Sequence, residues 1–274
     1  MVSEHDLDRF HDVELDGWRR LAAGYAQHLA DLMSQAIEPL LDAAGAAAGM
    51  HVLDLCCGPG HASDAIRRLG GVPLGVDFAP EMIALAKEKW PGLAFEVGDA
   101  ENLTRPDRSS DAVAMNFGLL HLARPEAAMG HIARVLKPGG RFAFTVWATP
   151  ADSVGHRIML GALNAHGTME VGLPAGPPLF RFADPQECAA LFAGAGLADM
   201  TFSKLQLRLD VPAPDGLFDA FTAGAVRVAI ILARQSPEAL AKVREAVRAA
   251  SAEYGRDGML GIPMTSVLVS GRKP

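Results

Sequence analysis

Short apolar runs alternate with segments of helical spacing between His51 and Trp147. The runs HVLDLC, VPLGVD, LAFEVG, DAVAMNF and RFAFTVW are typical of strands, whereas ASDAIRRLG, PEMIALAKEKW and PEAAMGHIARVLK repeat their apolar positions every three or four residues. Pro80 and Pro125 stand where helices favour a first-turn proline, and KPGG at residues 137–140 indicates a helix stop before the next strand. This alternation predicts a doubly wound α/β sheet with ligands beyond the carboxyl ends of its strands.

The segments on either side predict additions to this sheet. Residues 1–50 have amphipathic helical spacing and indicate an N-terminal helical cap, which leaves residues 51–274 as the main domain. The segment 149–182 is rich in Gly, Pro, His and Met and predicts an irregular insertion. After it we expect a helix at DPQECAALFAGAG, a strand at MTFSKLQLRLDV, one helix at PDGLFDAFTAGAVRVAIILARQ, another at SPEALAKVREAVRAASAEY, and a final strand at PMTSVLVSG. The insertions near 149–182 and 212–255 are expected to form a pocket.

Composition and charge narrow the classes of function. A net charge of -7 gives no general attraction to phosphate backbones, so we expect no nucleic-acid partner. Cys56, Cys57 and Cys188 offer neither a disulfide framework nor metal-ligand spacing, so we expect no metal and a cytoplasmic location. The N-terminal residues lack a signal-peptide pattern, and Arg227 interrupts the longest apolar stretch, so no membrane span is expected. Whether the protein forms a homodimer stays an open question at this point.

Three carboxylates lie at or just after the ends of the first three predicted strands. Asp54 lies near the end of the apolar run that opens the segment VLDLCCGPGHAS, Asp77 closes the second strand, and Asp99 follows the third. All three are therefore expected to converge on one edge of the sheet. Asp77 comes about 20 residues after the glycine turn, where an acid can accept both hydroxyls of a ribose. Asp99, beside the Ala100 amide, can pair with an adenine amino group. The alternatives are a solvated loop acid for Asp77 and a helix cap for Asp99.

These motifs, in their order and spacing, resemble the class I S-adenosylmethionine-dependent methyltransferases. The resemblance rests on VLDLCCGPG, GVDFAPEM, GDAENL, NFGLLH and RVLKPGGRFAF, and NFGLLH is similar to the ubiquinone/menaquinone C-methyltransferase branch. It implies a Rossmann-like, seven-stranded sheet with an antiparallel last strand. It also implies S-adenosyl-L-methionine as cofactor, and in-line methyl transfer to a small apolar or aromatic molecule in a water-excluded pocket. The cofactor-binding residues that we expect are Asp54, Cys56, Gly58, Gly60, Asp77, Phe78, Met82, Asp99, Ala100, Glu101 and Asn116.

The glycine turn departs from the family pattern at one position. The family usually has Asp-x-Gly-x-Gly-x-Gly, and here Cys56 stands in place of the first glycine. We expect a negative φ at Cys56 and a slightly reshaped loop that still binds the cofactor. The start of a helix lowers the pKa of thiols, but space-filling is the favoured interpretation for Cys56 and Cys57.

His121 is the candidate catalytic residue, because it follows NFGLL where the fourth predicted strand ends. It either takes a proton from the acceptor or only caps and fills its loop, and both interpretations stay open. Aromatic residues predict the acceptor pocket, with core packing as the alternative: Trp18, Tyr25, Trp147, Phe180 and Phe218. Two other functions compete with methyl transfer, namely an NAD-dependent oxidoreductase and a non-catalytic S-adenosylmethionine-binding protein of the same fold.

Overall fold

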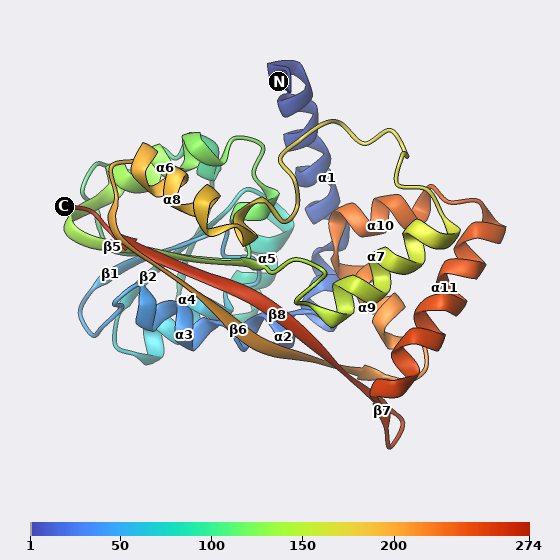
Figure 1. Ribbon diagram of the computed structural model, residues 1–274. Coiled ribbons are helices and arrows are strands. Elements are labelled where there is room, and N and C mark those ends of the chain that lie inside the picture. Colours follow the sequence, from blue (N-terminus) through green and yellow to red (C-terminus); the bar gives the residue numbers. More distant parts are fainter. Residues whose placement is uncertain (1) are drawn as a thin grey trace.

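The sheet in the computed structural model, which describes residues 2–274, has the predicted topology (Figure 1). Its main path runs β3-β2-β1-β4-β5-β8-β6, and the short β7 pairs with β8. The strands are β1 (His51–Leu55), β2 (Val72–Asp77), β3 (Ala94–Val97), β4 (Ser110–Asn116), β5 (Leu136–Trp147), β6 (Ala198–Pro212), β7 (Gly255–Arg256) and β8 (Met259–Arg272). The first five strands pair in parallel, and β8 runs antiparallel to β5 and β6. The predicted doubly wound sheet with an antiparallel last strand is confirmed.

Helices cover both faces of this sheet (Figure 1). The helices beside the sheet are α3 (Ile37–Ala43), α4 (His61–Arg68), α5 (Pro80–Lys89), α6 (Pro125–Val135) and α8 (Pro185–Gly194). Alternate residues of β5 are buried on opposite faces: Phe142 packs against Phe192 of α8 with ring centroids 5.9 Å apart, whereas Ala143 packs with Leu40 and Ile66 of α3 and α4. Burial on both faces explains the nearly continuous apolar run of this strand.

A second group of helices extends from the sheet around the long strands β6 and β8 (Figure 1). It comprises α7 (Val154–His166), α9 (Gly216–Gly224), α10 (Val226–Ala233) and α11 (Pro237–Ser251). The N-terminal helix α1 (Glu4–His28), followed by α2 (Ala30–Ser34), packs against α9, α10 and α5. The contact is close because Gly17 faces Val226 and Gly24 faces the Ala223 carbonyl, where a Cβ atom would collide. The helix α1 therefore bridges the sheet and the second helical group.

Two predicted elements differ from the structure. The segment 149–182 is not wholly irregular, because α7 occupies thirteen of its residues. Its glycines and histidines weaken the helical pattern in sequence, yet Gly155 lets the helix pack against Met264 of β8. The single helix expected at 214–235 is two helices, α9 and α10, which meet at Ala225 with a bend of 104°.

No single helix within residues 2–274 is long and apolar enough to cross a bilayer, although the bent pair α9 and α10 reaches the required length and composition when taken together.

Candidate functional site

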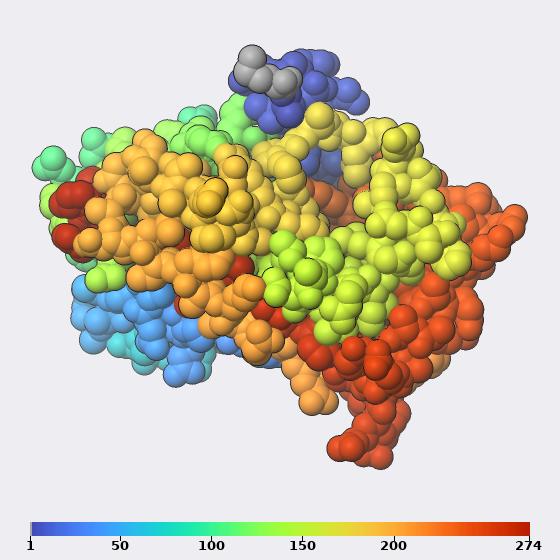
Figure 2. Space-filling view, in the orientation of Figure 1, coloured from blue at the N-terminus to red at the C-terminus, as the bar shows by residue number. Residues whose placement is uncertain are grey.

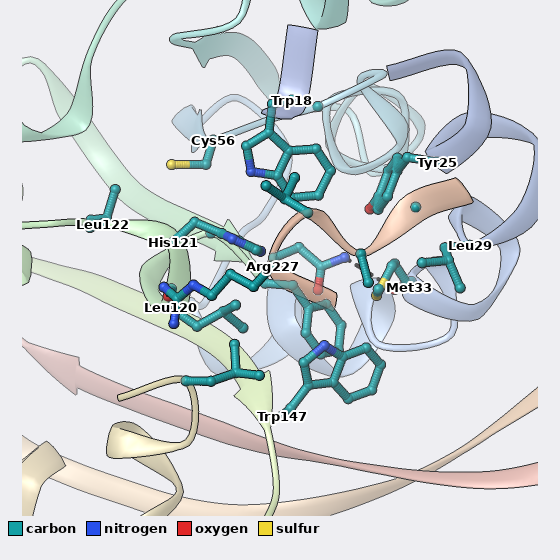
Figure 3. A pocket seen from close by; sticks show the side chains of 18 of the residues that line it. Trp18, Tyr25, Leu29, Met33, Cys56, Leu120, His121, Leu122, Trp147 and Arg227 are labelled. Carbon is teal, nitrogen blue, oxygen red and sulfur yellow. Dashed lines mark hydrogen bonds between the residues drawn. The ribbon is translucent and has the colours of Figure 1, made fainter. Parts of the chain in front are cut away.

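A hollow borders the ends of β1, β2 and β4 and is covered by α1, α9 and α10 (Figure 3). Its empty space, counted together with open solvent at its mouth, is about 1250 Å³. Twelve predicted site residues line it: Trp18, Tyr25, Cys56, Gly58, Asp77, Phe78, Met82, Asp99, Ala100, Asn116, His121 and Trp147. Asp54 lines a smaller cavity that shares Tyr25, Cys56, Gly58 and Asn116 with the first. The structure thus brings the predicted acids and most of the predicted aromatic residues into one continuous region.

Asp77 is held at the wall of the hollow by the glycine turn. Its Oδ2 accepts from the Gly58 amide at 2.9 Å, and its Oδ1 accepts from the Ala79 amide at 2.9 Å. Burial raises the pKa of Asp77 to about 6, even though these two hydrogen bonds favour its charged form. Each carboxylate oxygen has a further lone pair, so Asp77 can still accept hydrogen bonds from a ligand.

Asp54 has one carboxylate oxygen without a partner. Its Oδ2 accepts from Ser63 Oγ at 2.6 Å, whereas Oδ1 is buried and has no hydrogen bond. Burial raises the pKa of Asp54 to about 7, against the opposing effect of the Ser63 hydrogen bonds. A buried carboxylate without a full set of partners is costly, and a cationic or donor group in the adjoining cavity would satisfy it.

The conformation of Cys56 differs from the expectation. Its φ is +58°, in the left-handed region, and not negative as we expected. The turn needs this conformation at the position where the family has glycine, and a cysteine adopts it at a cost of roughly 1–2 kcal/mol. Burial raises the pKa of the Cys56 and Cys57 thiols well above their usual range. The thiols are therefore protonated, as the space-filling interpretation requires.

Asp99 interacts with the N-terminal helix. Its Oδ1 accepts from the Glu101 amide at 2.8 Å, which is the capping role considered as an alternative, and its Oδ2 lies 2.9 Å from His11 Nε2. The His11 ring packs edge-on against Phe78, with centroids 5.6 Å apart. Burial alone would raise the pKa of Asp99, but the hydrogen bonds from His11 and Glu101 lower it. A ligand that pairs with Asp99 must share it with His11.

The side chain of Asn116 ties the end of β4 to the N-terminal region. Its Nδ2 donates to the Met33 carbonyl at 3.0 Å, and its Oδ1 accepts from Thr145 Oγ1 at 2.7 Å. The next residue, Phe117, has φ +55° and donates its amide to Thr145. Its ring packs against Trp147, with centroids 4.3 Å apart. This turn directs the chain toward His121.

His121 belongs to a buried charged cluster that closes one side of the hollow. His121 Nδ1 lies 2.9 Å from Glu14 Oε2, and Arg227 Nε lies 2.6 Å from Glu14 Oε1. The Trp18 ring meets the imidazole edge-on at a centroid distance of 4.8 Å. Figure 3 shows Trp18, His121 and Arg227 together at the wall of the hollow. The cluster joins α1, the loop after β4, and α10.

The remaining wall of the hollow is apolar. Besides Trp147 it is lined by Leu160, Leu179, Phe221, Met264 and His156. His156 is the one titratable group among them, and burial lowers its pKa to about 3, so it is neutral at ordinary pH. Its Nδ1 is 2.9 Å from Ser153 Oγ. This chamber suits an uncharged, apolar molecule.

Four predicted site residues border neither cavity. Gly60, with φ +80°, begins α4 where a Cβ atom would meet the Phe95 ring. Glu101 accepts from the Ala123 amide at 2.6 Å. Phe180 packs edge-on against His156, and Phe218 lies beneath the Arg244 guanidinium. Ligand contacts by these four residues stay predictions.

The sequence interpretation missed His11, Glu14 and Arg227. Their partners are 88 to 213 residues away along the chain, so no local motif connects them. One signal was present: Glu14 lies midway between Phe10 and Trp18, at intervals of four residues, on the buried stripe of α1. A carboxylate on an apolar stripe indicates a buried partner. Among residues 2–274, no group of three or more His, Cys, Asp or Glu side chains is arranged to hold a metal ion.

Residues 53–144 match the family model described as "Methyltransferase domain". The demethylmenaquinone methyltransferase of Beutenbergia cavernae is 40% identical over 110 residues, which are 40% of this chain and 46% of that protein. The ubiquinone/menaquinone biosynthesis C-methyltransferase UbiE of Rubrivivax gelatinosus is 29% identical over 64% of this chain and 75% of its own length. The match thus spans less than half the length of the first of these relatives.

Solved structures share the fold over most of the chain. The YcgJ protein of Bacillus subtilis superposes with a TM-score of 0.55 at 22% identity and covers 87% of this chain and 98% of its own.

Proposed function

We propose that the chain belongs to the class I S-adenosylmethionine-dependent methyltransferases, close to the ubiquinone/menaquinone C-methyltransferase branch, and that it methylates a small apolar or aromatic molecule. The observation that carries this proposal is the junction of two unlike regions in one hollow. Carboxylates at the ends of β1, β2 and after β3 line one part, and an uncharged apolar chamber lines the other. A polar, cationic cofactor and an apolar acceptor need such neighbouring sites.

The residues present fit S-adenosylmethionine. The unpartnered Oδ1 of Asp54 suits the ammonium of its methionine part, and the free lone pairs of Asp77 suit the ribose hydroxyls. Gly58 leaves the backbone of the turn open to the ligand. Asp99 and the Ala100 amide suit the adenine edge, with Phe78 and Met82 as apolar neighbours. The roles of Cys56 and Asn116 are to shape the turn and the end of β4.

The protein's own contribution to the reaction is positioning and exclusion of water. When bound, S-adenosylmethionine supplies an activated methyl group on a sulfonium. Trp18, Tyr25 and Trp147 narrow the hollow between the two regions, which limits water and orients the acceptor. His121 is placed to take a proton from an acceptor whose nucleophile is a hydroxyl or an acidic C–H. The cap at residues 1–50 and the insertions near 149–182 and 212–255 together form the acceptor pocket.

Two alternative functions are less well supported. A nicotinamide-dependent oxidoreductase would use the glycine turn and Asp77 but gives no role to Asp99 or to the apolar chamber. A non-catalytic protein of this fold would need no base such as His121 at the wall of the hollow. We further propose that the protein acts in the cytoplasm and has no nucleic-acid partner. Light scattering will establish whether it forms a homodimer.

Calorimetry with S-adenosylhomocysteine and with NAD tests the cofactor. We expect binding of S-adenosylhomocysteine and little response to NAD, and the reverse would favour the oxidoreductase. The acceptor is then sought by incubating phenols, quinols, amines and apolar acids with methyl-labelled S-adenosylmethionine and measuring product mass. Binding without transfer to any compound of an extended panel would support the non-catalytic alternative.

A further inference from the structure

Glu14 is a buried carboxylate that no sequence motif assigns to a task. It lies in the middle of α1, only 1% exposed, between Phe10 and Trp18. Burial alone would raise the pKa of Glu14, but the charges and hydrogen bonds of His121 and Arg227 outweigh it and lower the pKa. Glu14 is therefore an ionised group inside the protein. An ion in such a place needs several partners, and its partners show what it can do.

Arg227 neutralises Glu14 and fixes its orientation. Its Nε donates to Glu14 Oε1 at 2.6 Å, and its two terminal nitrogens donate to the carbonyls of Pro177 and Leu120. The guanidinium also lies over the Phe10 ring, 4.5 Å from its centroid. In Figure 2 the loop that contains Pro177 (yellow) crosses near the blue N-terminal helix. Because Arg227 occupies Oε1, the other oxygen of Glu14 is left for His121.

The contact with Glu14 determines which nitrogen of His121 carries the hydrogen. An ionised carboxylate only accepts, so the hydrogen of the 2.9 Å contact lies on His121 Nδ1. In the neutral ring Nε2 is then an unprotonated acceptor. No hydrogen bond of the described residues involves Nε2, and the ring borders the hollow. The Trp18 ring, edge-on at 4.8 Å, limits rotation of the imidazole.

We propose that Glu14 is the positioning residue for His121, so that docking of α1 prepares Nε2 as the proton acceptor of the site. This inference rests on the proposed methyl transfer. In the proton step the X–H bond of the acceptor breaks, an Nε2–H bond forms, and the electron pair stays on X, the atom that becomes methylated. The imidazolium that results has Glu14 as its counter-ion, while Arg227 keeps that carboxylate in place. The base is complete only when α1, the loop after β4 and α10 meet.

Histidine-selective ¹⁵N NMR on the cofactor-free protein tests the inference without turnover, with Glu14→Gln as the variant and His121→Asn to assign the signal. We expect the neutral His121 ring of the wild type to carry its hydrogen on Nδ1. We expect the variant to lose this preference, since a glutamine amide can either accept from or donate to the ring. An identical tautomer and titration midpoint in both proteins would overturn the proposal.

Kinetics supply the second measurement. Glu14→Gln should lower kcat at least about tenfold, with KM for the cofactor nearly unchanged, and should shift the acidic limb of the kcat profile to lower pH. Because this change leaves Arg227 without its counter-ion, the double variant Glu14→Gln, Arg227→Met removes both charges and should show the same shift. Arg19→Gln is the matched control, since it breaks an exposed α1 contact with Glu81; its profile should match the wild type. Equal shifts in the control and the variant would assign the effect to helix docking alone and refute the positioning role.

The two hypotheses fail in different ways. If S-adenosylhomocysteine does not bind, the proposed function fails, whereas the tautomer measurement still reports on Glu14 and His121. If the cofactor binds and methyl transfer occurs, but Glu14→Gln leaves tautomer and pH profile unchanged, only the positioning role fails.

Discussion

Replacement of Asp54 by asparagine will change how the stability of the cofactor-free protein depends on pH. Burial raises the pKa of Asp54 to about 7 in the folded protein, from an ordinary value of 3.8. The folded state therefore binds a proton more tightly than the unfolded state does. It follows that stability is highest below the ordinary pKa and falls as pH rises between about 4 and 7. The unpartnered Oδ1 is the structural source of this cost.

The magnitude follows from the displacement of the pKa. A rise of about 3 units corresponds to about 4 kcal/mol between the two protonation states. At roughly 2–4 °C per kcal/mol for a chain of this size, the wild-type melting temperature should fall by about 8–16 °C between pH 4 and pH 8 through Asp54 alone. Asp54→Asn cannot ionise and should lose most of this slope. A smaller slope will persist, because burial raises the pKa of Asp77 to about 6 as well.

Differential scanning fluorimetry over this pH range is the assay, with Asp42→Asn as a control for an exposed acid of α3. The control should retain the wild-type slope. S-adenosylhomocysteine should reduce the slope in the wild type, because its ammonium gives ionised Asp54 a partner. If Asp54→Asn and the wild type lose stability equally as pH rises, Asp54 is not the strained carboxylate, and its assignment to the ammonium loses its physical basis.

Three further outcomes are expected. Asp77→Ala should weaken S-adenosylhomocysteine binding by about 1–3 kcal/mol in calorimetry, because charged hydrogen bonds to the ribose are lost. The control Glu96→Ala changes an exposed residue and should leave the dissociation constant unchanged, and equal constants for the two variants would refute the ribose role of Asp77. His121→Ala should lower kcat by about 10²–10⁴-fold with cofactor affinity intact, and an unchanged kcat would show that positioning alone activates the acceptor. Gly24→Ala should displace α1 from the Ala223 carbonyl and reduce turnover, whereas Gly130→Ala, where a Cβ meets nothing within 4 Å, should not. Equal turnover in the two variants would refute the proposal that the cap at residues 1–50 helps to form the acceptor pocket.

The acids of the site could be predicted from sequence because each one lies at or just after the carboxyl end of its strand. Asp77 and Asp99 end neighbouring parallel strands, so the fold alone brings them to one edge. The conformation of Cys56 could not be predicted from residue type, because cysteine seldom adopts a positive φ and only the surrounding turn requires it. The order of strands in the sequence therefore predicts the positions of the acids better than residue type predicts the backbone conformation of the turn beside them.

The charged cluster was beyond prediction for a different reason. Glu14, His121 and Arg227 come from three elements that meet only after the sheet and the second helical group have packed. The helix α7 was hidden in the same way, since Gly155 weakens its pattern in sequence but is needed for contact with β8. The role of such residues depends on neighbours that are distant along the chain. The one sign of them in the sequence is the position of Glu14 on the apolar stripe of α1.

The carboxylates and the apolar chamber of the hollow come from different segments of the chain. The carboxylates at the strand ends belong to the segment that matches the methyltransferase family. The apolar chamber instead comes from Trp147, α7, Leu179, α9 and β8, which, like α1 and α10, lie outside residues 53–144. We therefore expect the choice of acceptor to be determined by segments that the family match does not cover. The cluster of Glu14 and Arg227 links two of these segments to His121, which lies inside the match. Substitutions in α1 or α10 should therefore alter both the preference for an acceptor and the readiness of the base, without altering the affinity for the cofactor through Asp77.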